Sequence, residues 1–356
     1  MKILITGVCG FVGSSLAHAL LDRDFAHQII GIDNFSRPGS QLNREPLQKR
    51  GVRLIHGDLR TPSDLEAVPT IDWIIDAAAN PNVLAGVDGT TSSRQLIEHN
   101  LYGTVNMLEL AKQQKSGFVL LSTSRVYAIK PLANLPVTTR ELGFEPAADA
   151  DLPSGVSICG IAETFSTEPP VSLYGSSKLA SECIALEYGD TFNFSVWINR
   201  CGILAGAGQF GRPDQGIFAF WINAYLRRRP LKYIGFNGTG FQTRDCFHPR
   251  DLVPLLEKQM TNASTEKPRI VNLGGGPKNT MSLAQLSEWC SDRFGRHPVA
   301  SELTPRLFDI PWAVMDAGLA QETWKWEPAS PLSSILDEIA QHAEQNPAWL
   351  EISAAL

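Results

Sequence analysis

A tyrosine and a lysine stand four residues apart in the stretch SLYGSSKLASE, residues 172–182. If this stretch is helical, Tyr174 and Lys178 lie one above the other on the same side of the helix. A lysine ammonium group in that position would stabilise a tyrosine phenolate, so that the phenol could act as a general base near neutral pH. An ordinary helix start has the same pattern, so the interpretation depends on finding a cofactor site, a third hydroxyl group and a substrate site.

A glycine-rich turn near the N-terminus supplies the pattern of a dinucleotide site. The spacing G-x-x-G-x-x-G places Gly7, Gly10 and Gly13 between an apolar run at residues 2–6 and a helical pattern at residues 14–23. Glycine allows the backbone to turn tightly and a pyrophosphate to come close, while the helix N-terminus offers N–H groups to the phosphates. Three glycines at such a turn can also be purely structural.

Acidic residues follow the next two apolar runs, where a dinucleotide would be recognised. Asp33 lies 20 residues after Gly13, where a carboxylate would accept hydrogen bonds from the adenosine ribose and disfavour a 2′-phosphate. This favours NAD over NADP, although Arg37 nearby leaves the choice open. Asp58 could reach the adenine amine or cap a helix. The neighbouring positions that we expect to contact the cofactor are Phe11, Val12, Asn34, Leu59, Ala77, Ala78 and Ala79.

Apolar runs typical of buried strands alternate with helical patterns through the first half of the chain. The pattern predicts an α/β fold with a Rossmann-type, doubly wound parallel sheet that binds ligands beyond the carboxyl ends of its strands. We predict an NAD-binding domain over residues 1–204 and a substrate-binding lobe over 205–356, parts of which return to the sheet. The predicted strands lie at 2–6, 28–33, 52–58, 72–79, 117–124 and 194–202, and a long helix lies at 96–114.

Residues 130–170 interrupt this alternation with a segment rich in proline, alanine and acidic residues. Connections of this length inside a compact domain are usually functional lids or binding loops. We therefore expect the segment to lie near the substrate site.

Composition narrows the classes of function. The 356 residues carry a formal net charge of −6, which disfavours nucleic acid as a partner. The six cysteines show no C-x-x-C spacing, so no metal site is predicted, and free thiols fit a cytoplasmic protein. The apolar N-terminus is interrupted by glycines and lacks the pattern of an export signal, and no apolar run is long enough to span a membrane.

Taken together, these motifs resemble those of the extended short-chain dehydrogenase/reductase family. The resemblance rests on the glycine turn, Asp33, the GDL at 57–59, the AAA at 77–79, the STSRVY at 122–127 and the Tyr-x-x-x-Lys pair. It implies a Rossmann domain, a nicotinamide cofactor and a catalytic set of Thr123, Tyr174 and Lys178. In this family the catalytic hydroxyl stands three residues before a Val-Tyr pair, which selects Thr123 over the neighbouring serines.

The second half is similar to the CDP-tyvelose 2-epimerases of this family, at residues 208–222, 243–252 and 271–286. Family members that are 4,6-dehydratases have an Asp-Glu pair after the catalytic threonine, whereas Ser124 and Arg125 stand here. The resemblance implies C2 epimerisation of a nucleotide sugar, with a CDP-sugar favoured. The alternatives are a 4-epimerase, a net dehydrogenase and a non-catalytic NAD-binding protein. The residues expected to bind substrate are Ser124, Arg125, Arg200, Gln209, Phe210, Gln215, Arg244 and Arg306.

Relatives of this kind often form homodimers through two helices of each subunit. Here the candidate helices are residues 96–114 and 178–189. Both stretches are apolar enough to be buried either in the subunit or between subunits.

Overall fold

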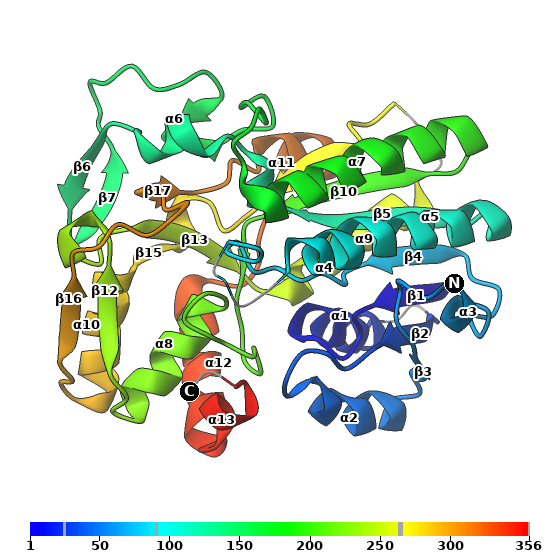
Figure 1. The fold of residues 1–356 in the computed structure, drawn as a ribbon, viewed down its shortest axis with the longest axis horizontal. Helices are drawn as coiled ribbons and strands as arrows, with labels where there is room; N and C mark the ends of the chain where they lie inside the picture. The colour runs from blue at the N-terminus through cyan, green and yellow to red at the C-terminus, as the bar shows by residue number, and fades with distance from the viewer. Residues whose placement is uncertain (24–25, 88, 90–91, 263–265, 355–356) are drawn as a thin grey trace.

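The protein contains a central sheet of seven parallel strands, in the order β14-β10-β5-β4-β1-β2-β3 (Figure 1). The structure is a computed structural model that describes residues 1–23, 26–87, 89, 92–262 and 266–354. The strand order confirms the predicted doubly wound parallel α/β fold. The strands are β1 (Lys2–Thr6), β2 (Gln28–Asp33), β3 (Arg53–His56), β4 (Trp73–Asp76), β5 (Gly117–Thr123), β10 (Val196–Cys201) and β14 (Ile270–Leu273).

Helices cover both faces of this sheet, which explains why its central strands are apolar throughout. Every residue of β4, β5 and β10 is buried. One face packs against α1 (Phe11–Leu21), α2 (Arg44–Lys49), α9 (Val253–Thr261) and α11 (Gly318–Trp324). The other packs against α3 (Pro62–Leu65), α5 (Gly103–Gln114) and α7 (Ser172–Phe192).

The helix predicted at 96–114 is composite. It begins as α4 (Ser93–Ile97), passes through a single π-helical turn, η2 (Glu98–Tyr102), and continues as α5. π-helical turns inside helices are frequent at functional sites. The periodicity of the apolar residues does not reveal this turn, because the chain remains helical through it.

The C-terminal half builds a smaller lobe, seen to the left in Figure 1, around a separate apolar core. Its main sheet joins β11 (Ile203–Leu204), β13 (Thr243–Phe247) and β15 (Thr280–Ser282), with β17 (Trp312–Ala313) beside β13; β12 (Leu231–Ile234) pairs with β16 (Val299–Glu302). The packing helices are α8 (Ile217–Leu226), α10 (Leu283–Phe294), α12 (Leu332–Gln345) and α13 (Trp349–Ile352). Short 3₁₀ turns are η1 (Ser40–Asn43), η3 (Ser124–Val126), η4 (Phe236–Gly238), η5 (Pro249–Leu252) and η6 (Pro277–Asn279).

The segment 130–170 folds into α6 (Ile129–Ala133) and two small hairpins, β6 (Val137–Arg140) with β7 (Gly143–Pro146) and β8 (Val156–Ser157) with β9 (Gly160–Ile161). Its apolar side chains share a core with Trp312 and Val314 of the C-terminal lobe. Ser282 Oγ donates a hydrogen bond to the Leu142 carbonyl, 2.7 Å away, at the tip of the first hairpin. The segment is therefore anchored to the smaller lobe by packing.

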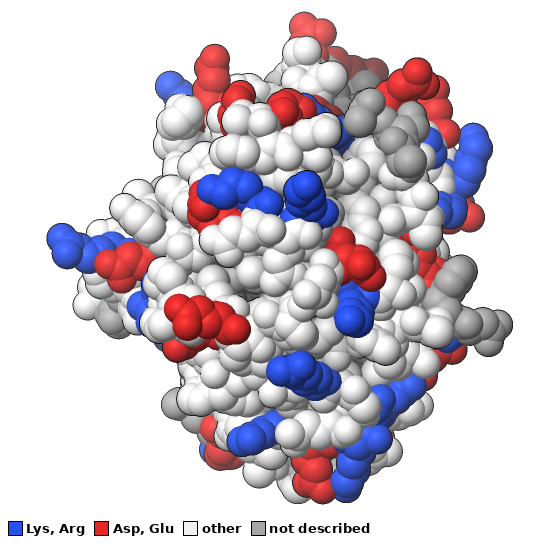
Figure 2. All heavy atoms as spheres, turned by 90° about the vertical axis from the view of Figure 1, so that its right-hand side faces the viewer, with Lys and Arg blue, Asp and Glu red and all other residues white. Residues whose placement is uncertain are grey.

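The surface carries charges of both signs. Figure 2 shows acidic and basic side chains interspersed on the face that it presents. Among the described residues, none of the helices combines the length and the apolar character needed to cross a bilayer.

Candidate active site

The larger of two adjoining cavities has a volume of about 620 Å³ and lies at the carboxyl ends of the central strands. The predicted cofactor positions line it, with the exception of Lys178, which is buried behind its wall. These lining positions are Gly7, Gly10, Phe11, Val12, Asp33, Asn34, Asp58, Leu59, Ala77, Ala78, Ala79 and Tyr174. The structure thus brings these predicted residues, from five separate parts of the sequence, to one cavity.

The glycine turn has the shape that a bound diphosphate requires. Gly7 has a φ of 62°, and a Cβ atom on it would lie 3.0 Å from Ala78 Cα. A Cβ atom on Gly13 would lie only 2.3 Å from the Gly7 carbonyl oxygen. These close approaches hold the N-terminus of α1 at the cavity, where backbone N–H groups and the helix dipole favour an anion. The residues present therefore fit the diphosphate of a dinucleotide.

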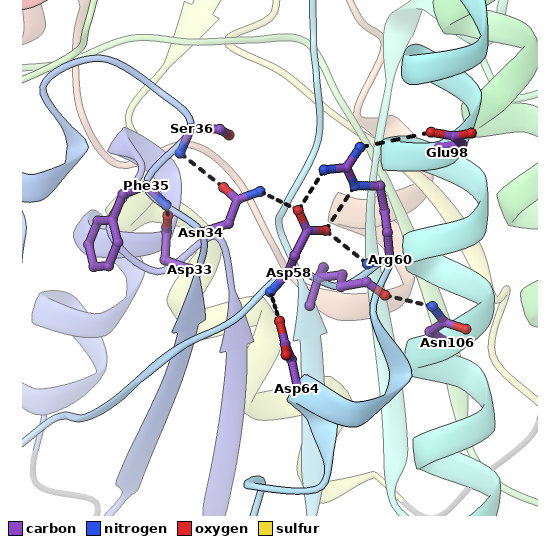
Figure 3. A network of polar contacts seen from close by, with 10 residues as sticks. Asp33, Asn34, Phe35, Ser36, Asp58, Arg60, Asp64, Glu98 and Asn106 are labelled. Atoms are coloured by element: carbon purple, nitrogen blue, oxygen red, sulfur yellow. Dashed lines mark hydrogen bonds and ion pairs between the residues drawn. The ribbon is translucent and has the colours of Figure 1, made fainter.

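Asp33 is held at the cavity wall by the backbone. Its two carboxylate oxygens accept hydrogen bonds from the Cys9 and Phe35 N–H groups, each at 2.8 Å (Figure 3 shows the second). Burial raises the pKa of this carboxyl, and the backbone hydrogen bonds oppose that shift. Each carboxylate oxygen has a further lone pair, so Asp33 can still accept hydrogen bonds from ribose hydroxyls.

Asp58 is already hydrogen bonded to Arg60, a residue that belongs to none of the sequence motifs. Arg60 donates to its carboxylate from Nε at 2.9 Å and Nη2 at 2.7 Å, and Asn34 Nδ2 donates at 3.1 Å (Figure 3). The hydrogen bonds from Arg60 hold the pKa of Asp58 well below its usual range. The Arg60 guanidinium itself lines the cavity, so it joins Asp58 at the expected adenine end. The only sequence signal was its position two residues after Asp58.

Arg37 connects the cofactor cavity to the smaller lobe. Its guanidinium donates to Gln215 Oε1 at 2.8 Å and also to the Phe210 carbonyl oxygen. The Phe210 ring is buried and stacks on Trp349, with ring centroids 5.2 Å apart. Phe210 therefore supports the loop, whereas its ring is not free to stack on a base.

Gln209 is likewise held by the smaller lobe. Its Nε2 donates to the Leu204 carbonyl at 2.8 Å, and its own carbonyl accepts from Trp349 Nε1 at 2.8 Å. Gln209, Phe210 and Ser124 line the cofactor cavity, while Gln215 lines both cavities.

Two of the three predicted catalytic residues, Thr123 and Tyr174, line the cofactor cavity together with Arg125, which lines both cavities. Thr123 ends β5, and Tyr174 lies in the first turn of α7. A Cβ atom on Gly175 would lie 2.1 Å from the Arg125 carbonyl oxygen, so glycine is what allows α7 to approach the η3 turn after β5 this closely. Burial raises the pKa of Tyr174, whereas the hydrogen bond from Thr123 and the charge of Arg125 lower it.

Lys178 lies one helical turn beyond Tyr174 and is only 1% exposed. Burial lowers its pKa, because an ammonium group is poorly solvated inside the protein. The negative charges of Asp76 and Glu182 act in the opposite direction. The structure thus places both residues on α7 with the four-residue spacing that the sequence shows, Tyr174 on the cavity wall and Lys178 behind it.

The second cavity, of about 410 Å³, combines a basic end with an apolar wall. Arg125, Arg244 and Arg306 all line it. Arg244 Nη2 forms an ion pair with Asp309 Oδ1 at 2.9 Å. Burial, and after it the positive charge of Arg244, lowers the pKa of Arg125 to about 10. With Lys232, four basic side chains line this cavity against two carboxylates, Asp214 and Asp309, and this excess of positive charge favours an anionic ligand. The apolar wall is formed by Ile203, Phe218, Phe220, Trp221, Leu231, Ile234, Met281 and Leu307.

Arg200 lies elsewhere. Its side chain is 6% exposed and pairs with Glu182 inside the protein, with Nη2 and Oε2 2.7 Å apart. Neither cavity has Arg200 on its wall. Strand alternation directs this side chain from β10 toward α7, whereas a ligand binds at the strand's end.

The segment 130–170 also lies outside the two cavities. None of its residues lines either one, because the segment packs against β13, β15 and β17 and in the core around Trp312. The segment nevertheless contacts the wall of the second cavity from behind, because Leu142 accepts a hydrogen bond from Ser282, which lines that cavity.

Two further residues emerge only from the structure. Asn100, in the π-helical turn, accepts from the Asn80 N–H at 2.7 Å and donates to Ser177 Oγ at 3.1 Å, which ties the turn after β4 to α7. Asp76 ends β4 and is buried close to Lys178. No spacing rule marks either residue, because their partners are distant in sequence. In the part of the chain that is described, His, Cys, Asp and Glu side chains form no group of three that could hold a metal ion.

Comparisons with known proteins agree with this architecture. The chain is 30% identical to CDP-paratose 2-epimerase of Salmonella typhi over 327 residues, which cover 86% of this chain and 90% of that protein. It is 26% identical over 355 residues to UDP-glucuronate 4-epimerase of Thermodesulfobacterium geofontis, covering 96% of each. The crystal structure of UDP-glucuronic acid 4-epimerase from Bacillus cereus, in complex with UDP-glucuronic acid and NAD, matches with a TM-score of 0.76 and 25% identity, over 97% of this chain and 99% of that one.

A model of the NAD dependent epimerase/dehydratase family matches residues 3–274. This match confirms the resemblance to extended short-chain dehydrogenases/reductases and NAD as the cofactor, for which the glycine turn and Asp33 are suitably placed. The chain is therefore an enzyme that belongs to the NAD dependent epimerase/dehydratase family.

Proposed function

We propose that the protein is a nucleotide-sugar epimerase that inverts C2 of a CDP-linked sugar. The observation that carries the proposal is that Thr123 and Tyr174 line the cofactor cavity together with Arg125, which also lines a basic, partly apolar second cavity. The similarity to CDP-paratose 2-epimerase supports the choice of carbon and base.

The side chains around Tyr174 can move the proton that the reaction requires. NAD, when bound, supplies a reversible hydride acceptor beside them. Tyr174 takes the proton of the sugar hydroxyl and later returns it, while Thr123 donates a hydrogen bond that holds the sugar oxygen. Lys178 holds a positive charge one turn away and favours the phenolate form of Tyr174.

The second cavity fits the rest of a nucleoside diphosphate sugar. Arg244 and Arg306 are placed to bind the diphosphate, because guanidinium groups form paired, charge-assisted hydrogen bonds with phosphate oxygens. The apolar wall that includes Trp221 and Ile234 can bury the flat faces of a pyrimidine. The sugar then reaches from the diphosphate toward Tyr174.

A second candidate is 4-epimerisation of a UDP-linked uronic acid. Arg125 lines both cavities and lies close enough to Tyr174 to influence its pKa. A cation at that point could bind a sugar carboxylate, and two of the similar proteins are UDP-glucuronate 4-epimerases. The two candidates share the same proton-transfer residues and differ in the sugar that Arg125 would hold.

The test is turnover of CDP- and UDP-linked sugars, with the inverted carbon assigned by NMR. The C2 proposal expects inversion at C2 without accumulation of NADH; inversion at C4 of a UDP-uronate selects the second candidate, and stoichiometric NADH release indicates a net dehydrogenase. Tyr174→Phe should lower kcat by about 10²–10⁴-fold. Tyr188→Phe is the matched control, because Tyr188 lies on the same helix outside both cavities and its hydroxyl donates to Glu109 Oε1 at 2.7 Å. Near wild-type turnover in Tyr174→Phe would contradict the assignment.

We also infer that the protein is a homodimer formed through α5 and α7. The large side chains of Tyr102 and Phe192, at the ends of these helices, are 59% and 45% exposed. Light scattering coupled to size-exclusion chromatography measures the assembly, and a monomer at micromolar concentration would contradict the inference.

A further inference from the structure

We propose that Asp76 is a positioning residue of this active site, whose buried carboxylate supplies the negative charge that keeps Lys178 protonated beside Tyr174. The inference rests on the proposed function of the Tyr174–Lys178 pair. Nothing in the motifs pointed to Asp76, which ends β4 about 100 residues before Lys178.

The Asp76 carboxylate is buried away from solvent. The residue is 1% exposed, and among the described residues two hydroxyl groups donate hydrogen bonds to its oxygens, Thr6 Oγ1 at 2.7 Å and Thr104 Oγ1 at 2.8 Å. Within the described ranges, no lysine, arginine or histidine forms an ion pair with it. A buried charge of this kind is costly unless an opposite charge lies near it.

Hydrogen bonds connect this carboxylate to the helix that carries Lys178. The Thr104 hydroxyl, whose single proton points to Asp76, lies 2.9 Å from the Asn100 carbonyl oxygen, and Ser181 Oγ lies 3.2 Å from the same oxygen and 2.9 Å from the Ser177 carbonyl oxygen. Asn100 Nδ2 donates to Ser177 Oγ at 3.1 Å. Ser177 and Ser181 flank Lys178 on α7, so the end of β4 and this turn of the helix are held in fixed relation.

The other groups that face Lys178 do not supply an unmatched negative charge. Glu182, on α7, is paired with Arg200 of β10 through Nη2 and Oε2 at 2.7 Å. The Cys201 thiol, also on β10, is neutral near pH 7, because burial raises its pKa to about 12. Asp76 is thus the negative group beside Lys178 whose charge no other cation balances.

The consequence for catalysis follows from the coupling between the two titrating groups. Tyr174 can act as a base only while Lys178 carries its proton, because the ammonium charge stabilises the phenolate. Removing the negative charge of Asp76 lowers the pKa of Lys178. The ammonium group is then lost at lower pH, and the activity declines earlier on the alkaline side.

The test is the pH profile of kcat/KM for Asp76→Asn, which removes the charge and keeps the size of the side chain. We expect the alkaline limb to move down by about one to three pH units. Asp76→Glu retains the charge, so its limb should stay near the wild-type position even if the rate falls. Asp72→Asn is the matched control: Asp72 stands exposed at the start of the same strand and accepts the Lys2 N–H at 2.7 Å. A uniform loss of rate with no movement of the limb would overturn the proposal.

A second measurement works without substrate and applies even if Asp76→Asn folds poorly. Lys178→Met leaves Asp76 buried without its counter-charge, so the melting temperature should fall. Adding Asp76→Asn to Lys178→Met should restore much of that loss, because both buried charges are then gone. Failure of the double variant to recover would overturn the electrostatic coupling. Because this cycle needs no turnover, its result is separate from a failure of the proposed epimerase function, which would appear as an absence of products in the wild type.

Discussion

Removing one partner of the buried ion pair between Glu182 and Arg200 should strongly destabilise the protein. The side chains are 3% and 6% exposed, and the guanidinium contacts the carboxylate from Nη2 at 2.7 Å and from Nε at 3.1 Å. Glu182→Gln keeps the shape but leaves the Arg200 charge without a counter-charge. Breaking a buried pair in this way costs about 3–5 kcal/mol, mostly through the desolvated charge that remains.

The measurement is thermal or denaturant unfolding, with a surface pair as the control. Asp190 and Arg269 form a similar two-point contact, at 2.7 and 2.9 Å, but their side chains are 64% and 33% exposed. Solvent and salt screen such a pair, so Asp190→Asn should leave the unfolding midpoint nearly unchanged. If Glu182→Gln costs no more than Asp190→Asn, the reasoning from burial is wrong.

A double substitution separates the two roles that Arg200 could have. Arg200→Met with Glu182→Leu removes both charges, so it should recover most of the stability lost in Glu182→Gln. The KM of this double variant should stay near the wild-type value, because Arg200 is absent from the cavity walls. A large rise in KM in a stable double variant would instead restore the role in substrate binding expected from the sequence.

Two further predictions concern the cofactor turn and a buried histidine. Gly7→Ala should lower both the NAD affinity and the melting temperature, because the residue has a φ of 62° and a Cβ atom would lie 3.0 Å from Ala78 Cα. If calorimetric titration of the variant gives the same NAD affinity as the wild type, this prediction is wrong. Burial, and after it the charge of Arg250, lowers the pKa of His248 to about 4, so the folded protein holds the imidazole neutral. The neutral imidazole contributes fully to the stability of the fold above about pH 6.5, and this contribution is lost as the pH falls toward 4. His248→Asn keeps an acceptor for the Arg250 N–H, and between about pH 6.5 and pH 4 this variant should lose less stability than the wild type. If the free energy of unfolding falls equally with pH in both proteins, His248 is not the group responsible.

The cofactor site was largely predictable from the sequence because its signals are local. Backbone conformation at Gly7 and the placement of Asp33 at a strand end depend on residues adjacent in the chain. The spacing of Tyr174 and Lys178 likewise depends only on helical geometry. The spacing of apolar residues likewise predicted the strands and helices of the sheet, because this spacing is set by the local geometry of each element.

The substrate side was less predictable, because residue type alone does not state what a side chain contacts. Arg200 and Arg244 both lie in β-strands, yet Arg200 forms a buried ion pair with Glu182 whereas Arg244 lines a cavity. Phe210 was expected to contact substrate but stacks on Trp349, which lies 139 residues later in the chain. The position of the segment 130–170 was set by which apolar surface it could cover.

The sequence by itself therefore determined the Rossmann architecture, the dinucleotide turn and the pairing of a phenol with an ammonium group. Only the tertiary structure decided that Asp76 would lie beside Lys178 and that Arg37 would reach across to Gln215, 178 residues away. Dihedral preferences and periodicity act over a few residues, so the sequence displays them directly. Contacts between distant residues arise only when the elements pack, and electrostatic partners in the dry interior are selected at that stage.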